Sequence, residues 1–149
     1  MPVTARLLGL SGLLPQWACL AVLVAGPEGW HYWAISIAAI YAAAILSFLG
    51  GMWWGLAASA SFRSRVPAFV WFAAVTPTLV AVAAMLPWIF GYSFPGPSLW
   101  AMGGGIGLSV AIDAWLRRTL ADVPQWWLAL RIPLSTGLSV ATMACAWLA

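Results

Sequence analysis

The chain has 149 residues, of which 64% are hydrophobic and only 6% are charged, and its formal net charge is +3. Soluble domains carry about 25% charged residues, so this composition excludes an ordinary soluble domain and indicates an integral membrane protein. The basic residues are all arginines spread along the chain, which excludes the clustered basic face of a nucleic-acid-binding protein.

Five apolar segments reach or approach the length of about 20 residues that a helix needs to cross a bilayer. In chain order, spans are predicted over residues 7–26, 33–60, 67–87, 99–116 and 131–149. The first follows Arg6 as a signal peptide would, but it is long, is interrupted by Pro15 and lacks a clear A-x-A site, so an uncleaved helix is expected. The connections are short, which predicts a single-domain, all-α bundle whose successive helices are antiparallel neighbours.

The segment 117–130 (RRTLADVPQWWLAL) is the most distinctive connection. Asp122 is a suitable N-cap for a short helix opened by Pro124, and Trp126 and Trp127 would then lie among lipid headgroups. We therefore predict an interfacial helix here, with an irregular loop as the alternative.

With five spans, every arginine falls on the side of the membrane that holds the N-terminus. The positive-inside rule then predicts a cytoplasmic N-terminus and an external C-terminus. These arginines are Arg6, Arg63, Arg65, Arg117, Arg118 and Arg131.

The 12 tryptophans suggest a ligand cage, but most of them lie close to the ends of the predicted spans. Aromatic belts at the two membrane interfaces are the expected explanation for such positions. Only Trp17 lies deep. The predicted inner belt contains Trp53, Trp54, Trp71, Trp115, Trp126 and Trp127, and the outer belt contains Trp30, Trp33, Trp88, Trp100 and Trp147.

Helix-breaking residues recur at a similar depth in the first four spans. They are Pro15, Gly50-Gly51, Pro77 and Gly103-Gly104-Gly105. One interpretation is close helix packing through the small-residue faces Gly51-xxx-Gly55 and Gly103-xxx-Gly107, and this is favoured. The other is a polar mid-membrane cavity in which backbone carbonyls freed by proline find new partners. The side chains expected to line it are Gln16, Trp17, Ser47, Thr76, Thr78 and Ser109.

Asp113 is the one acid inside a predicted span, which makes it a functional candidate. Arg117 follows at i+4, so a structural ion pair is predicted in preference to a proton relay.

Cys19 and Cys145 are interpreted as buried apolar residues, and whether the two side chains are in contact is left open. We predict no catalytic, cofactor-binding or metal site, since His31 beside Glu28 offers too few ligands for zinc.

The stretch ILSFLGGMWWGLA (residues 45–57) resembles the signature of a small membrane family of unknown function typified by transmembrane protein 69. LLGLSGLLP (7–15), AVTPTLVA (74–81) and PQWWLALRIPLS (124–135) fit the same family in order, and Asp113 matches an acid late in its fourth span. Relatives often have a basic residue or histidine at the position of Trp53. Any role of that basic side chain in the relatives cannot be assigned to this chain. The resemblance implies an inner-membrane setting and the motif positions Ser47, Gly50, Gly51, Trp54, Gly55, Asp113, Arg131 and Pro133.

For function, we expect a non-enzymatic protein of the bacterial inner membrane, with the mitochondrial inner membrane as the alternative. An accessory or assembly factor that associates with other membrane proteins, or with copies of itself, is the leading hypothesis. A binder of a hydrophobic or tetrapyrrole-like ligand in a mid-membrane cavity is the second hypothesis, and a small transporter or channel is the third. No cofactor is expected, and the bilayer itself is the one certain partner.

Overall fold

A computed structural model describes residues 2–62, 65–92, 95–120 and 123–149, and these residues form helices and their connections with no strand among them. Five helical segments are long and apolar enough to cross a membrane, which confirms the predicted all-α architecture and the number of spans. The helices are α1 (Val3–Ser11), α2 (Leu14–Ala25), α3 (His31–Ser61), α4 (Ala68–Ile89), α5 (Gly96–Thr119) and α6 (Trp127–Trp147), with a short 3-10 turn at Glu28–Trp30.

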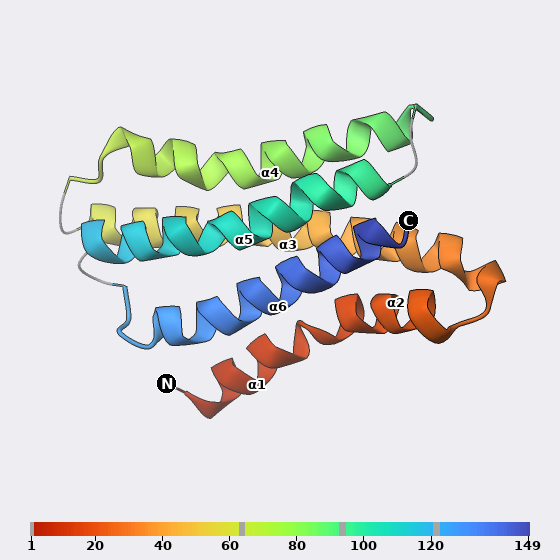
Figure 1. Ribbon diagram of the computed structural model, residues 1–149. Coiled ribbons are helices and arrows are strands. Elements are labelled where there is room, and N and C mark those ends of the chain that lie inside the picture. The colour runs from red at the N-terminus through yellow and green to blue at the C-terminus, as the bar shows by residue number, and fades with distance from the viewer. Residues whose placement is uncertain (1, 63–64, 93–94, 121–122) are drawn as a thin grey trace.

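The helices lie side by side along a common direction, and the chain ends lie at opposite ends of the bundle (Figure 1). The N-terminus and the α3–α4 and α5–α6 connections share one end, so the described arginines Arg6, Arg65, Arg117, Arg118 and Arg131 all belong to that half of the molecule. We call it the arginine-bearing end. Arg63 lies outside the described residues, and the cytoplasmic placement of this end remains a prediction.

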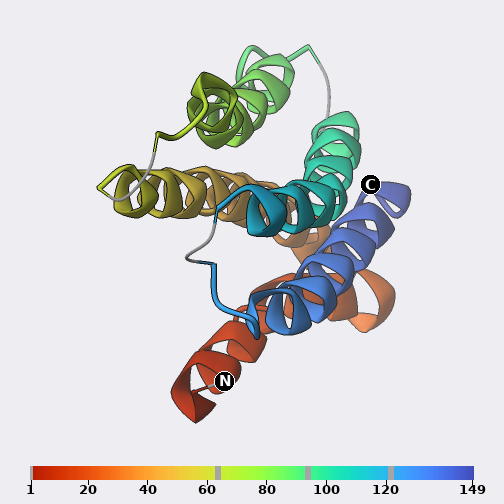
Figure 2. The same ribbon diagram turned by 90° about the vertical axis from the view of Figure 1, so that its left-hand side faces the viewer.

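Helix α3 is the central element, since it contacts α2, α4, α5 and α6. Helix α4 packs mainly on α3, and α5 packs mainly on α6. Seen from the arginine-bearing end, α4 and α1 lie on opposite sides of the bundle, and α1 projects away from it (Figure 2). This arrangement leaves α1 and α4 with the most lipid-facing surface.

The first span is divided into α1 and α2 at Gly12-Leu13. Pro15 has no backbone N–H to continue the helical ladder, which explains a break just before it. The hydroxyl of Tyr41 on α3 donates a hydrogen bond to the carbonyl of Gly12. A hydroxyl therefore satisfies the broken helix, as expected in lipid, although the sequence analysis did not identify Tyr41 as its source.

The glycines divide into packed and open positions. A Cβ added at Gly50 would lie 2.5 Å from the carbonyl oxygen of Ala74, so α3 and α4 approach closely there. Gly103 and Gly107 lie against Met143 and Ser139 of α6, as a packing face requires.

The predicted packing role of Gly51-xxx-Gly55 is wrong within this chain, because an added Cβ at either position would meet nothing within 4 Å. The predicted interfacial helix over 117–130 is also wrong in the part that is described. Helix α5 continues to Thr119, and residues 120 and 123–126 are not helical. Asp122, the expected cap, lies outside the described residues.

Candidate functional site

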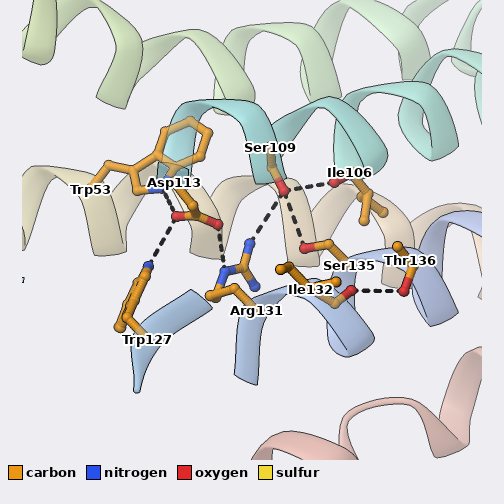
Figure 3. Close-up of polar contacts among 9 residues, drawn as sticks. All are labelled: Trp53, Ile106, Ser109, Asp113, Trp127, Arg131, Ile132, Ser135 and Thr136. Carbon is orange, nitrogen blue, oxygen red and sulfur yellow. Dashed lines mark hydrogen bonds and ion pairs between the residues drawn. The ribbon is translucent and has the colours of Figure 1, made fainter. Parts of the chain in front are cut away.

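A buried ion pair joins α5 to α6 near the arginine-bearing end. Asp113 is 0% exposed and Arg131, about one turn inside α6, is 7% exposed. The Nε of Arg131 donates to Oδ2 of Asp113 over 2.7 Å. The other carboxylate oxygen, Oδ1, accepts hydrogen bonds from the indole Nε1 of Trp53 at 2.8 Å and of Trp127 at 3.3 Å (Figure 3).

Hydroxyl groups extend this cluster toward the middle of the bundle. The Nη2 of Arg131 donates to Oγ of Ser109 over 3.2 Å, and Ser109 in turn lies 3.2 Å from Oγ of Ser135. Further along, Ser139 donates to the carbonyl of Gly103 over 2.8 Å. Residues four apart share a helix face, so the polar positions of α5 and α6 form two stripes that meet.

Asp113 pairs with Arg131, and its predicted pairing with Arg117 is wrong. Asp113 faces the bundle interior, whereas Arg117 is exposed in the last turn of α5. A cation is favourable there, since it complements the helix C-terminus. Arg131, in contrast, is buried, and Asp113 supplies the counter-charge that allows its burial.

Two tryptophans assigned to the inner belt have a different role. Trp53 is 1% exposed, and its indole, with that of Trp127, donates to Asp113. Asp113 thus receives hydrogen bonds from three side chains. The carboxylate is fully engaged in structural contacts, which favours an ion pair over a proton relay. The spacing of Arg131, Ser135 and Ser139 at i, i+4 and i+8 was the sequence signal for this cluster.

A lateral groove of about 400 Å³ lies between α3, α4 and α5. We call it the α4–α5 groove. Pro77, Gly104 and Gly105 line it, together with Trp53 and Trp100. Some of the predicted helix-breaking residues therefore line one groove. The wall of this groove is almost entirely apolar, so it is not the polar cavity that was predicted. Gln16, Trp17, Ser47 and Ser109 do not line it.

The remaining candidates lie apart from the ion pair. Trp17 is 45% exposed on the outside of α2, so its predicted place in a cavity is wrong. The neighbouring Gln16 is 0% exposed, and neither polar atom of its amide has a hydrogen-bond partner.

Trp54 faces outward and makes an edge contact with Trp71. Ser47 is half-buried, Pro133 is exposed, and Cys19 and Cys145 are free thiols in the same buried cluster.

Residues 1–148 match the family described as "Protein of unknown function (DUF3429)". The chain belongs to this family. It is also 31% identical over 131 residues to transmembrane protein 69 of Xenopus tropicalis, a match that covers 87% of this chain and 48% of that protein. The chain thus spans about half the length of that relative. No solved structure gives a significant match.

These matches confirm the predicted membership of a membrane family of unknown function. Two of the motif positions that carried the resemblance, Asp113 and Arg131, lie 18 residues apart in sequence and form the buried ion pair. A third, Gly50, lies where α3 approaches α4 closely. These three motif positions therefore make internal contacts, whereas Gly51, Trp54, Gly55 and Pro133 are exposed.

Proposed function

We propose that this DUF3429 protein is a non-enzymatic accessory or assembly factor of a bacterial or mitochondrial inner membrane. It would associate with another membrane protein through the outward face of α3 that carries Gly51 and Gly55. The observation behind this proposal is that both glycines are exposed and open, with no atom near an added Cβ.

Small residues at i and i+4 let two helices approach closely in lipid, where van der Waals packing drives association. The comparable pair Gly103 and Gly107 is already used by α6. Phe48 and Trp54 lie beside the open glycines and are exposed, so they would add apolar contact area around the close approach. The engagement of Asp113 by three donors supports the absence of acid–base chemistry at that residue.

Stoichiometric co-purification tests the proposal. The protein is extracted from its native membrane in mild detergent, and a larger membrane protein should accompany it. The double variant Gly51→Leu/Gly55→Leu should lose that partner. Ala83→Leu, which adds the same side chain at an exposed position of α4, should retain it. Extraction of the wild type alone would contradict the proposal, and recovery as a defined oligomer would make a second copy the partner.

The α4–α5 groove supports a second candidate function, the binding of a flat or hydrophobic ligand such as a tetrapyrrole. Trp100 is exposed and offers a ring for stacking. The groove has a volume of about 400 Å³, within the range of small-molecule sites. Gly104→Leu would fill this space, because an added Cβ there has nothing nearer than 3.9 Å. Mass spectrometry of the native-lipid extract should then show one small molecule in wild type and none in Gly104→Leu. No comparable observation within the described ranges favours a transporter or channel.

A further inference from the structure

A second groove, separate from the one between α4 and α5, opens beside the ion pair. It lies between α1, α3 and α6 and has a volume of about 400 Å³. We call it the α1–α6 groove. Its walls are apolar side chains such as Leu8, Phe48 and Leu134, and Trp126 and Trp127 also line it. Among the described residues, Arg131 is its one charged lining residue.

Arg131 has hydrogen-bonding capacity that the protein leaves unused. Its Nε donates to Asp113 and its Nη2 to Ser109. A guanidinium has more N–H donors than these contacts use, and its Nη1 makes no hydrogen bond to any residue that the structure describes. Among the described residues, the side-chain atoms that are fully buried without a partner are those of the Gln16 amide, so Nη1 of Arg131 keeps some accessible surface. The side chain is more than nine-tenths buried, so the groove is the route by which an acceptor reaches it.

We propose that the α1–α6 groove binds one anionic phospholipid, whose phosphate accepts hydrogen bonds from the free Nη1 of Arg131. The acyl chains lie against the apolar walls formed by α1, α3 and α6. Arginine is suited to this task because its planar donors match the oxygens of a phosphate. The headgroup then lies beside Trp126 and Trp127, at the depth where tryptophan meets the membrane interface.

The charge distribution selects an anionic lipid. The described arginines Arg6, Arg65, Arg117, Arg118 and Arg131 belong to the arginine-bearing end, whereas Asp113 is the acid that the described residues place there. Asp113 is already used by Arg131, so the pair attracts no further cation, and the surrounding arginines favour a negative headgroup. A free inorganic anion would make no contact with the apolar side chains of the groove. A phospholipid packs its acyl chains against them while its phosphate accepts hydrogen bonds from Arg131.

This site is independent of the proposed function. It is formed by α1, α3 and α6, whereas the proposed protein-binding face is the open side of α3 at Gly51 and Gly55. Phe48 borders both surfaces, but Leu8 and Arg131 line the groove and Gly51 and Gly55 do not. Loss of lipid binding and loss of a protein partner are therefore distinguishable by variants that alter one surface only.

Native mass spectrometry of the full chain tests the lipid site. The protein is released from nanodiscs containing equal amounts of phosphatidylglycerol and phosphatidylcholine, and bound lipids are counted. Wild type should retain one phosphatidylglycerol, at least tenfold in excess of phosphatidylcholine. Leu8→Trp, which fills the groove, should lower this retention at least tenfold. Leu7→Trp is the matched control, because Leu7 is exposed to a similar extent (63% against 69%) and does not line the groove.

The double variant Asp113→Asn/Arg131→Gln keeps the cluster neutral and hydrogen-bonded while it removes the guanidinium. It should fold, as judged by circular dichroism, and lose the preference for phosphatidylglycerol. Equal retention of the two lipids by wild type would overturn the proposal. So would equal effects of Leu8→Trp and Leu7→Trp. If Leu8→Trp instead releases a protein subunit and leaves lipid retention unchanged, the groove holds a polypeptide and the lipid assignment is wrong.

Discussion

The buried ion pair makes the most demanding prediction, because its partners should be strongly coupled. At the observed 2.7 Å, the attraction between Asp113 and Arg131 is about 6 kcal/mol at an effective dielectric constant of about 20. Desolvation of both charges opposes this gain, so the net stabilisation is much smaller. Removing one partner leaves the other charge buried alone, which costs about 3–5 kcal/mol.

A double-mutant cycle measures this coupling. Asp113→Asn retains an acceptor for the indoles of Trp53 and Trp127 but leaves the guanidinium without a counter-charge. Arg131→Gln leaves the carboxylate without one. Each single variant should lower the free energy of unfolding by about 3–5 kcal/mol, whereas the double variant should lose only about 1–2 kcal/mol, because no uncompensated charge remains.

The assay is unfolding in mixed micelles with increasing denaturing detergent, followed by circular dichroism. Additive single effects, with a coupling energy below about 0.5 kcal/mol, would refute the reasoning. That result would mean that the two side chains do not depend on each other in the membrane. It would also remove the physical basis for burying Arg131.

Three further predictions follow from neighbouring pairs of residues and from the charge pattern. Trp53→Phe should cost about 1.5–3 kcal/mol in the same assay, since it removes a hydrogen bond to a charged group, whereas Trp54→Phe should change stability little. Gly50→Ala should destabilise by about 1–3 kcal/mol because its Cβ would collide with a backbone carbonyl, while Gly51→Ala, in open space, should be neutral or stabilising by up to about 1 kcal/mol. A larger loss of stability in Gly51→Ala than in Gly50→Ala would contradict the helix contacts described for these two glycines. A reporter fused after Ala149 should lie outside while the N-terminus lies in the cytoplasm, and a shared compartment would exclude five spans.

The first helix shows how far local patterns predict this fold. Pro15 predicts an interruption, because the missing N–H is a property of the residue alone. The partner that satisfies the interruption is Tyr41, which is 29 residues away from Gly12 along the chain. No local pattern identifies Tyr41, because its contact with Gly12 depends on the orientation of α3 about its own axis.

The two small-residue faces make the same point with opposite outcomes. Gly51-xxx-Gly55 and Gly103-xxx-Gly107 look alike in sequence, yet the first is open and the second packs on α6. A motif of this kind permits a close approach but does not choose which helix makes it. The neighbouring Gly50, one residue away from the open face, forms the contact with α4.

The sequence by itself determined the class, the number of spans and the family, because hydrophobic length and arginine positions act through the bilayer and need no tertiary contact. The tertiary structure alone decided that Asp113 meets Arg131 and not the nearer Arg117, and that Trp53 faces inward. The reason is that a buried charge is paired by whatever lies across the helix interface, and the relative rotation of helices is set by side-chain packing over the whole bundle.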